Sequence, residues 1–272
     1  MNDYTPFAEL YDLFYDDFQD DIEMYRGFAG RTGGPILEVG SGTGRVALAL
    51  AEEGHTVVGL ELSDAMRAVA QHNAERAQRI DRVTFVAGDM RRFKIDQYFG
   101  LIIVPLNTFL HNLTLDDQLA TLACFKRHVR PGGLLVLDCF NPDPATAADD
   151  GRLIVQRSVI DRATGQAAWL LLSRTTDWGN QRQEITYLID RTDLSGVVRR
   201  AVLQTSFRFI LRNELPLLLR QGGFDLKEVY GSYDLEAFEA GSDKLIDVAT
   251  PASLTFLRDE ADADQARARG DG

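Results

Sequence analysis

The chain has 272 residues, of which 45% are hydrophobic, so one domain, or one domain with an insertion, can bury a sizeable core. Its formal net charge of -12 argues against a protein that binds nucleic-acid backbones, because phosphate contacts need clustered Lys and Arg. The two cysteines, Cys124 and Cys139, show no CxxC spacing and no neighbouring His cluster, so we expect neither a disulfide framework nor a metal site.

From residue 35 onward, short apolar runs alternate with helical patterns, which is typical of βαβ units in a mainly parallel sheet. We predict strands at 35–39, 56–62, 82–87, 101–106 and 134–140. We predict helices at 45–53, 64–77 and from residue 114 to the Pro-Gly-Gly turn at 131–133. Ser63 and Thr114 are suited to cap the second and third of these helices.

After residue 150 the pattern becomes rich in strands and lacks long helices. We predict an antiparallel insertion with strands at 153–160, 168–176, 184–191 and 197–210. A helix at 213–221 and two further strands, at 226–230 and 244–249, then complete the main sheet. The fold class is therefore α/β: a seven-stranded, mainly parallel sheet with helices on both faces, plus an antiparallel β insertion after the fifth strand.

Residues 38–44 read Glu-Val-Gly-Ser-Gly-Thr-Gly and lie directly between a predicted strand and a predicted helix. The glycines let the backbone turn tightly near a ligand, and the helix start offers unpaired N–H groups. This context predicts a nucleotide-like ligand. A dinucleotide fingerprint would place its third glycine one residue after Gly44, and a pyrophosphate gains nothing from the carboxylate of Glu38. That carboxylate suits a cationic group such as an amino-acid ammonium.

Two more carboxylates lie at the ends of the next predicted strands. Glu61 closes the second strand, where a carboxylate can accept hydrogen bonds from ribose hydroxyls of either NAD or an adenosyl cofactor. Asp89 follows the third strand, where an adenine amino group could find an acceptor between the apolar side chains of Leu62 and Met90. Because the carboxyl ends of parallel strands meet in one crevice, we expect these carboxylates to converge with Glu38.

The segments ILEVGSGTG, GLELSDAM, AGDM and HVRPGGLLVLD resemble motifs I to III, the PGG turn and the fifth strand of class I S-adenosylmethionine-dependent methyltransferases. The resemblance is close over about residues 35–140. It implies a Rossmann-like fold, S-adenosyl-L-methionine as cofactor and S-adenosyl-L-homocysteine as product. The cofactor-binding residues that it implies are Glu38, Gly40, Ser41, Gly42, Gly44, Glu61, Leu62, Met66, Asp89, Met90, Leu106 and Asn107.

We accordingly expect five parts along the chain. They are an N-terminal helical cap (1–34), a Rossmann-like cofactor-binding core (35–150), the antiparallel β insertion (151–212), a return to the core sheet (213–256) and a tail (257–272) whose composition predicts disorder.

The segment PLNTFLH at 105–111 lies where class I enzymes place groups near the reacting methyl. It is neither the NPPY nor the DPPY motif of amino-directed nucleic-acid enzymes, nor the Pro-Cys of cytosine-C5 enzymes. Together with the N-terminal tyrosines and the β insertion, it is similar in arrangement to glycine N-methyltransferase-like enzymes and sugar N,N-dimethyltransferases. This resemblance implies Tyr11, Tyr15 and His111 as catalytic residues. The alternatives are that the tyrosines pack on the sheet and that His111 is a polar helix-start residue.

We expect in-line methyl transfer to the N or O of a small-molecule acceptor, with no nucleic-acid and no membrane partner and a possible homodimer through the β insertion. The acidic start and the lack of ~18 consecutive apolar residues predict a cytoplasmic protein. Three alternatives stay open: an RNA- or protein-directed methyltransferase, an NAD-dependent oxidoreductase, and a non-catalytic cofactor-binding module.

Overall fold

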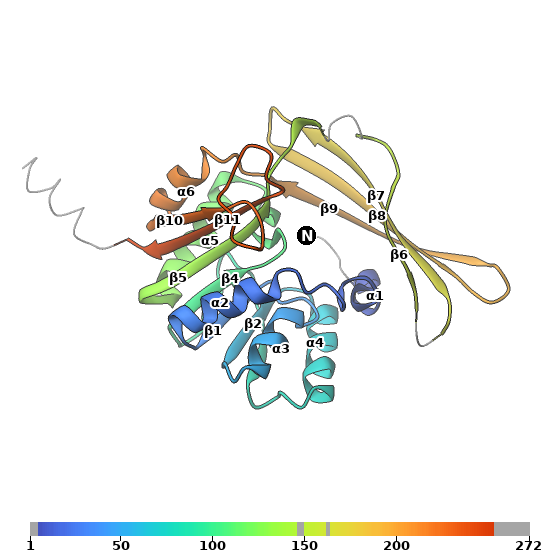
Figure 1. The fold of residues 1–272 in the computed structure, drawn as a ribbon, viewed down its shortest axis with the longest axis horizontal. Helices are drawn as coiled ribbons and strands as arrows, with labels where there is room; N and C mark the ends of the chain where they lie inside the picture. Colours follow the sequence, from blue (N-terminus) through green and yellow to red (C-terminus); the bar gives the residue numbers. More distant parts are fainter. Residues whose placement is uncertain (1–4, 146–149, 162–163, 253–272) are drawn as a thin grey trace, which may run out of the picture.

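The computed structural model describes residues 5–145, 150–161 and 164–252 (Figure 1). The tail expected at 257–272 lies outside these residues. The helices are α1 (Thr5–Tyr15), α2 (Ile22–Thr32), α3 (Arg45–Glu52), α4 (Asp64–Arg76), the 3₁₀ turn η1 (Thr108–His111), α5 (Leu115–His128) and α6 (Leu215–Gln221). The strands are β1 (Ile36–Val39), β2 (Val57–Glu61), β3 (Val83–Ala87), β4 (Phe99–Val104), β5 (Val129–Phe140), β6 (Ile154–Ile160), β7 (Ala167–Asp177), β8 (Arg182–Thr192), β9 (Val198–Arg208), β10 (Phe224–Tyr230) and β11 (Lys244–Pro251).

The main sheet, sheet A, has seven strands in the order β10-β11-β5-β4-β1-β2-β3. Strands β1 to β5 pair in parallel, and β11 pairs antiparallel with both β5 and β10. This arrangement confirms the mainly parallel sheet predicted from the alternating pattern. The strand order reverses between β1 and β4, and ligands of open α/β sheets bind outside the carboxyl ends of the strands at such a point.

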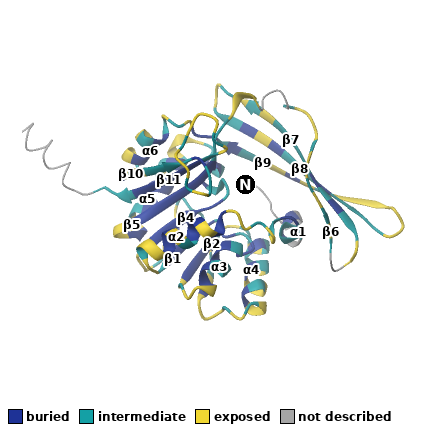
Figure 2. Ribbon diagram, in the orientation of Figure 1, coloured by how far each residue is buried: buried dark blue, intermediate teal, exposed yellow. Residues whose placement is uncertain are grey.

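Helices cover sheet A on both faces, as the continuous apolar strands predict. Successive residues of β1 point to opposite faces: Ile36 packs in a core with α2 and α3, and Leu37 packs in a core with α5 and α6. Figure 2 shows the central strands as the most deeply buried part of the molecule. None of the described helices is long and apolar enough to cross a membrane.

The four remaining strands form sheet B, antiparallel in the order β6-β7-β8-β9, and so confirm the predicted insertion. Helix α1 contacts β6 and β9 on one side and α4 on the other, as Figure 1 shows. The apolar side chains of Phe14, Met66 and Leu203 belong to the core that joins them. Helix α1 therefore lies between sheet B and α4, which in turn contacts β2 and β3 of sheet A.

Several predicted strand boundaries differ from the structure, and two of these differences have a clear local reason. The Pro-Gly-Gly turn was predicted to precede the fifth strand, but β5 already begins at Val129, which pairs with Phe99. The glycines make this possible, since Gly132 has a φ of 74° within an irregular part of the ladder. The fourth strand ends at Val104 rather than at Leu106, because Leu106 and the next residue adopt positive φ values of 49° and 67°.

Asp247 on β11 has a 1% exposed side chain, and neither carboxyl oxygen has a hydrogen-bond partner among the described residues. Burial raises its pKa to about 8, and Arg212 opposes this shift. The folded protein thus holds this proton up to about pH 8, whereas an unfolded Asp loses it near pH 4. Stability is consequently lost as pH rises through this window.

We expect Asp247→Asn, a neutral isostere, to raise the free energy of unfolding by about 1–3 kcal/mol at pH 8. Near pH 4 the same substitution should have little effect, because the wild-type carboxyl is protonated in the folded state and still about half protonated in the unfolded state. Urea denaturation at the two pH values measures the difference. An equal effect at both would contradict the assignment of a buried neutral carboxyl.

Candidate functional site

A cavity of about 1000 Å³ opens at the carboxyl ends of β1 to β4, at the point where the strand order reverses. Its lining includes the three predicted catalytic residues and eleven of the twelve predicted cofactor residues. Gly44 is the predicted residue that is absent from the described lining. The cavity also receives residues from α1 and sheet B, so it extends between the two sheets.

The glycine loop between β1 and α3 forms one wall of this cavity. Gly40 has a φ of 71°, and its N–H donates to the carbonyl of Leu60 at 2.7 Å. A Cβ atom at Gly40 would lie 2.3 Å from Cγ2 of Thr108. Gly42 has a φ of 54° and nothing within 4 Å of its Cβ position, which leaves the backbone open to a ligand.

Gly44 has a packing role that its place in the motif conceals. It has a φ of 89°, and a Cβ atom there would lie 2.7 Å from the ring of Phe85 on β3. Its function is therefore to let α3 begin close against the sheet. In this respect Gly44 differs from Gly40 and Gly42, which line the cavity.

Glu61, at the end of β2, has two roles. Its Oε2 accepts from the N–H of Gly42 at 2.9 Å, and its Oε1 accepts from the N–H of Ser63 at 2.8 Å. Burial raises the pKa of Glu61, and these backbone N–H groups oppose the shift. Each carboxylate oxygen keeps a second acceptor site, so Glu61 can shape the loop and still bind hydroxyl groups of a ligand.

Two buried polar atoms in the cavity wall lack partners among the described residues. They are Oε2 of Glu38, whose side chain is 2% exposed, and Oγ of Ser41. Burial raises the pKa of Glu38 to about 8, although the nearby cation of Arg45 and the N–H of Ala47 oppose this. Buried polar groups are rarely left unpaired, so the wall fits a ligand with a cationic group near Glu38 and a polar atom near Ser41.

Arg45, the first residue of α3, forms a buried ion pair that the sequence did not predict. It donates to Oδ1 and Oδ2 of Asp21 at 2.7 and 2.6 Å, and the two side chains are 9% and 0% exposed. A third bond runs from Arg45 to the carbonyl of Phe18 at 2.8 Å. Asp21 lies in a segment without a motif, so no local signal marks the pair.

Asp89, after β3, is held by the Arg91 guanidinium at 2.7–3.2 Å. This contact lowers the pKa of Asp89, against the effect of burial. Arg91 also donates to Asp117 of α5 at 2.9 Å. Asp89 is therefore an ionised hydrogen-bond acceptor whose position is fixed by Arg91. A donor group of a ligand would bind to the same carboxylate as Arg91.

Asp138, on the neighbouring strand β5, stabilises the turn after β4. The N–H of Leu106 donates to Oδ2 of Asp138 at 3.0 Å, and Oδ1 of Asn107 accepts from the N–H of Phe140 at 2.6 Å. Asp138 is fully buried and also pairs with Lys244 at 3.1 Å. These bonds stabilise the two positive-φ residues that line the cavity.

The predicted tyrosines lie together on α1 and line the cavity. The rings of Tyr11 and Tyr15 stack with centroids 4.6 Å apart. Burial raises the pKa of Tyr15, and the guanidinium of Arg157, 5.4 Å from its ring centroid, opposes the shift. Helix α1 therefore brings two aromatic side chains to the cavity, and burial keeps that of Tyr15 neutral.

His111 ends η1 and packs against Phe207 of β9, with ring centroids 4.7 Å apart. Burial lowers its pKa to about 4, and a hydrogen bond with the backbone of Ser206 opposes this shift. This pKa lies below the value of ~6.5 that is usual for a histidine. The sequence could not show that sheet B would cover the ring, and this cover keeps His111 neutral at physiological pH.

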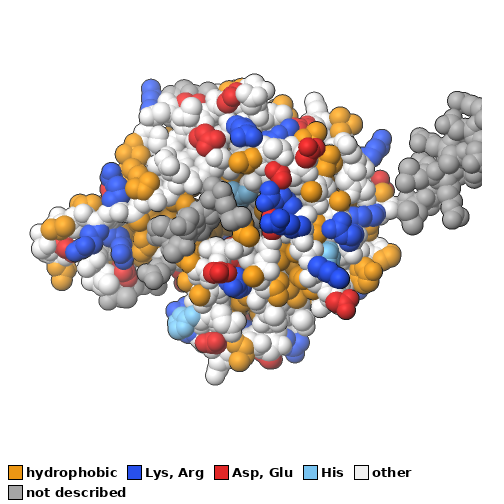
Figure 3. Space-filling model, turned by 180° about the vertical axis from the view of Figure 1, so that it is seen from behind, with side chains coloured by type: hydrophobic (Ala, Val, Ile, Leu, Met, Phe, Trp, Pro, Cys, Tyr) orange, Lys and Arg blue, Asp and Glu red, His pale blue; other side chains and the backbone are white. Residues whose placement is uncertain are grey.

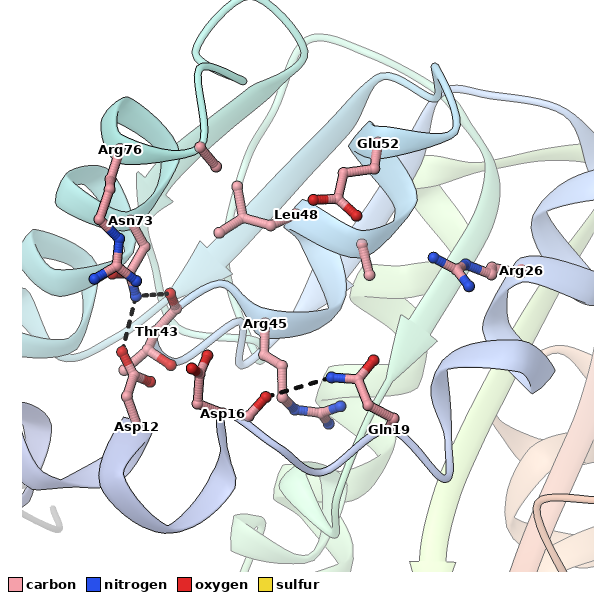
Figure 4. Close-up of a pocket in the computed structure, with 12 residues that line it drawn as sticks. Asp12, Asp16, Gln19, Arg26, Thr43, Arg45, Leu48, Glu52, Asn73 and Arg76 are labelled. Atoms are coloured by element: carbon pink, nitrogen blue, oxygen red, sulfur yellow. Dashed lines mark hydrogen bonds between the residues drawn. The ribbon is translucent and has the colours of Figure 1, made fainter. Parts of the chain in front are cut away.

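A second, smaller hollow of about 260 Å³ lies beside the first, on the outer side of the glycine loop (Figure 4). There Nδ2 of Asn73 donates to Asp12 at 2.9 Å and to the carbonyl of Thr43 at 3.1 Å. Figure 4 shows Arg45 extending from α3 toward the segment that carries Gln19. These contacts connect α1, α4 and the glycine loop, so α1 is positioned from both sides.

Comparison with known proteins places this geometry in context. Residues 36–133 match a family model described as a methyltransferase domain. The cypemycin N-terminal methyltransferase of Streptomyces sp is 28% identical over 228 residues, which cover 83% of this chain and 85% of that protein. A dTDP-4-amino-2,3,4,6-tetradeoxy-D-glucose N,N-dimethyltransferase of Saccharopolyspora spinosa is 34% identical over 103 residues, which cover 38% of this chain and 39% of that protein.

Among solved structures, the CcbJ methyltransferase from Streptomyces caelestis is similar with a TM-score of 0.76 and 24% identity. The match covers 92% of this chain and 100% of that chain. The likeness extends over both sheets and shows a shared fold.

Proposed function

We propose that this chain, whose residues 36–133 match a methyltransferase domain, is a class I S-adenosylmethionine-dependent methyltransferase that methylates the nitrogen of a small-molecule or peptide amine. The cofactor is S-adenosylmethionine, as the resemblance of the motifs implied. One observation carries the proposal: a single cavity joins the carboxylates at the strand ends to an aromatic wall from α1 and sheet B. The names of the relatives, which specify N-terminal and N,N-dimethyl transfer, support the choice of nitrogen.

In this proposal, the chain's own residues hold the cofactor at the strand ends. Glu38 binds the ammonium of the methionine part, and Glu61 accepts from ribose hydroxyls. The open backbone of Gly42 allows close approach, and Ser41 supplies a polar contact. Asp89 accepts from the adenine amino group together with Arg91. The remaining proposed contacts come from Gly40, Leu62, Met66, Met90, Leu106 and Asn107, all of which line the cavity.

When bound, the cofactor supplies a methyl carbon that passes from sulfur, which keeps the electron pair, to the acceptor nitrogen, which then loses one proton. The chain's main task is to align the acceptor and to exclude water. The rings of Tyr11 and Tyr15 offer electron-rich faces to a positive charge. A neutral amine needs no base before attack, whereas a hydroxyl acceptor would need a stronger base than His111, whose pKa is about 4. The site therefore favours nitrogen over hydroxyl oxygen.

His111 should act by orientation rather than as a general base. We expect the pH–rate profile of kcat to show no limb near pH 6.5, because His111 is protonated only as pH falls through about 4. His111→Asn should keep turnover within about tenfold of wild type, since loss of a true base typically costs ~10²–10⁴. A limb near pH 6.5 that disappears in His111→Asn would assign the base role after all.

Labelled methyl transfer tests the proposed acceptor class. We expect label from S-adenosylmethionine in the small-molecule and peptide fractions of a cell extract, and not in RNA. On the face shown in Figure 3, basic side chains are interspersed with acidic ones, which supports this expectation. Methyl transfer to RNA, together with tight RNA binding whose affinity falls steeply as salt is added, would contradict the proposal. Glu61→Ala, which removes the proposed ribose contact, should lose transfer and serves as the negative control.

We also propose self-association through the outer face of sheet B. Neighbouring strands place Leu171, Leu188 and Val202 in one row across this face, and Val202 is 49% exposed. An exposed apolar row of this kind suits an interface between two copies. Light scattering should show a dimer that Val202→Glu converts to a monomer. A monomeric wild-type protein at all concentrations tested would exclude it.

A further inference from the structure

We infer that the acceptor carries an apolar or aromatic group beside its amine and no phosphate, so that amines attached to nucleoside diphosphates are poor substrates. This inference rests on the proposed function and specifies the substrate class of the same cavity. It follows from the residues that α1 and sheet B contribute to the lining, and from the partners of the neighbouring arginines.

The wall formed by α1 and sheet B is almost wholly aromatic and apolar. Its described lining residues, apart from Gln156 at β6, are Phe7, Tyr11, Tyr15, Tyr187, Leu203 and Phe207.

Ring contacts connect this wall from α1 to sheet B. The centroids of Phe7 and Tyr11 are 5.9 Å apart, and those of Phe7 and Tyr187 are 6.1 Å apart. At the other side, Phe207 contacts His111, which burial keeps neutral at physiological pH. A group that enters here loses its hydration and gains aromatic contacts, which favours an apolar substituent.

The arginines that line the cavity already form ion pairs with carboxylates of the protein. Arg45 and Arg91 line it, but Arg45 pairs with Asp21, and Arg91 pairs with Asp89 and Asp117. A pyrophosphate needs a guanidinium or ammonium partner, or the open start of a helix. To obtain a guanidinium partner here, it would have to break a buried or shared ion pair.

One further group near the aromatic wall disfavours an anion. The start of α5 faces the cavity with Asp117, whose carboxylate would repel a phosphate. Arg157, which stacks over Tyr15, is a cation, but it already donates to the carbonyl of Phe14 and pairs with Asp17 at 3.4 Å, so its charge is partly balanced. An amine beside an apolar group meets no repulsion from Asp117.

Steady-state kinetics with three amines tests the inference. The probes are phenylalanine amide, alanine amide and uridine diphosphate glucosamine, and the readout is S-adenosylhomocysteine formation. We expect kcat/KM for phenylalanine amide to exceed that for alanine amide by at least about tenfold, as burial of one aromatic side chain predicts. Uridine diphosphate glucosamine should be at least tenfold poorer than phenylalanine amide.

Preferential turnover of uridine diphosphate glucosamine would overturn the inference, as would equal kcat/KM for the two amides. Absence of turnover with phenylalanine amide, combined with no binding of it to the S-adenosylhomocysteine complex by calorimetry, would also overturn it. In that case calorimetric binding of S-adenosylmethionine would show that the proposed function still stands. No binding of that cofactor would mean that the proposed function itself has failed.

A variant that adds a free cation gives an independent test. Gln156 is exposed at the cavity rim on β6, so Gln156→Arg should fold normally. We expect it to increase inhibition by uridine diphosphate at least threefold at low salt, because it places a new cation at the cavity rim. Ser158→Arg, at an exposed position of the same strand that does not line the cavity, is the matched control. Strong inhibition of the wild-type enzyme by uridine diphosphate would contradict the inference.

Discussion

Glu38→Gln is expected to weaken S-adenosylmethionine binding by roughly 10–100-fold, the loss that follows when a charge-assisted contact of about 1.5–3 kcal/mol is removed. Glu38 is buried, its Oε2 has no partner among the described residues, and its pKa is raised to about 8. Without ligand the carboxyl is therefore mostly protonated at pH 6.5. A bound ammonium favours the carboxylate, so binding should release close to one proton.

The pH dependence follows from the direction of this shift. Below pH 8 the ligand-free protein must give up a proton before Glu38 can pair with the ammonium. Affinity should therefore fall as pH is lowered from 8 toward 6, by up to about tenfold per pH unit.

Titration calorimetry at pH 6.5 in two buffers of different ionisation enthalpy measures the proton release directly. Glu38→Gln should remove this proton release. Glu75→Gln, at an exposed position on α4, should leave both the affinity for S-adenosylmethionine and the proton release unchanged. Equal heats in the two buffers for the wild-type protein would show that Glu38 is already ionised or does not face the ammonium.

Asp21→Ala should lower the free energy of unfolding by about 3–5 kcal/mol, because it leaves the buried guanidinium of Arg45 without its carboxylate. The remaining bond from Arg45 to the carbonyl of Phe18 cannot neutralise that charge. Since Arg45 is the first residue of α3, the loss should also loosen the glycine loop.

The chain offers a matched control for this prediction. Asp190 also accepts two hydrogen bonds from an arginine, Arg200, but that arginine side chain is 49% exposed. Asp190→Ala should therefore lower the free energy of unfolding by less than about 1 kcal/mol. Urea denaturation of both variants measures the difference in their free energies of unfolding, provided that the two curves have the same m-value. Equal losses in the two variants would mean that burial of the Asp21 pair does not determine its contribution.

The sequence predicted those parts of the site that depend on the order of strands and loops. Glu38, Glu61 and Asp89 each lie at or just after the carboxyl end of a parallel strand, and such strands end at one edge of the sheet, so their convergence required no knowledge of packing. The same reasoning located the turn after β4 that carries His111. Local patterns were sufficient here because each residue is positioned by the strand directly before it.

The sequence could not predict properties that arise from contacts between distant segments. The pKa of His111 depends on Phe207, which lies on a strand of the insertion. The pair of Asp21 and Arg45 joins a segment before α2 to the start of α3, and no motif marks it. The spacing of Gly44 fits a ligand-binding loop, yet the ring of Phe85 from β3 occupies the space that a Cβ atom at Gly44 would need. In each case tertiary packing decides the role.

The central claim is that the cavity transfers a methyl group to nitrogen, and one measurement tests it most directly. The enzyme is incubated with S-adenosylmethionine carrying a ¹³C-labelled methyl group and with its acceptor, and the product is examined by ¹H–¹³C correlation spectroscopy. The account predicts one new labelled methyl signal in the range of carbon bound to nitrogen. A labelled methyl in the range of carbon bound to oxygen, or label that stays entirely in the cofactor, would contradict it.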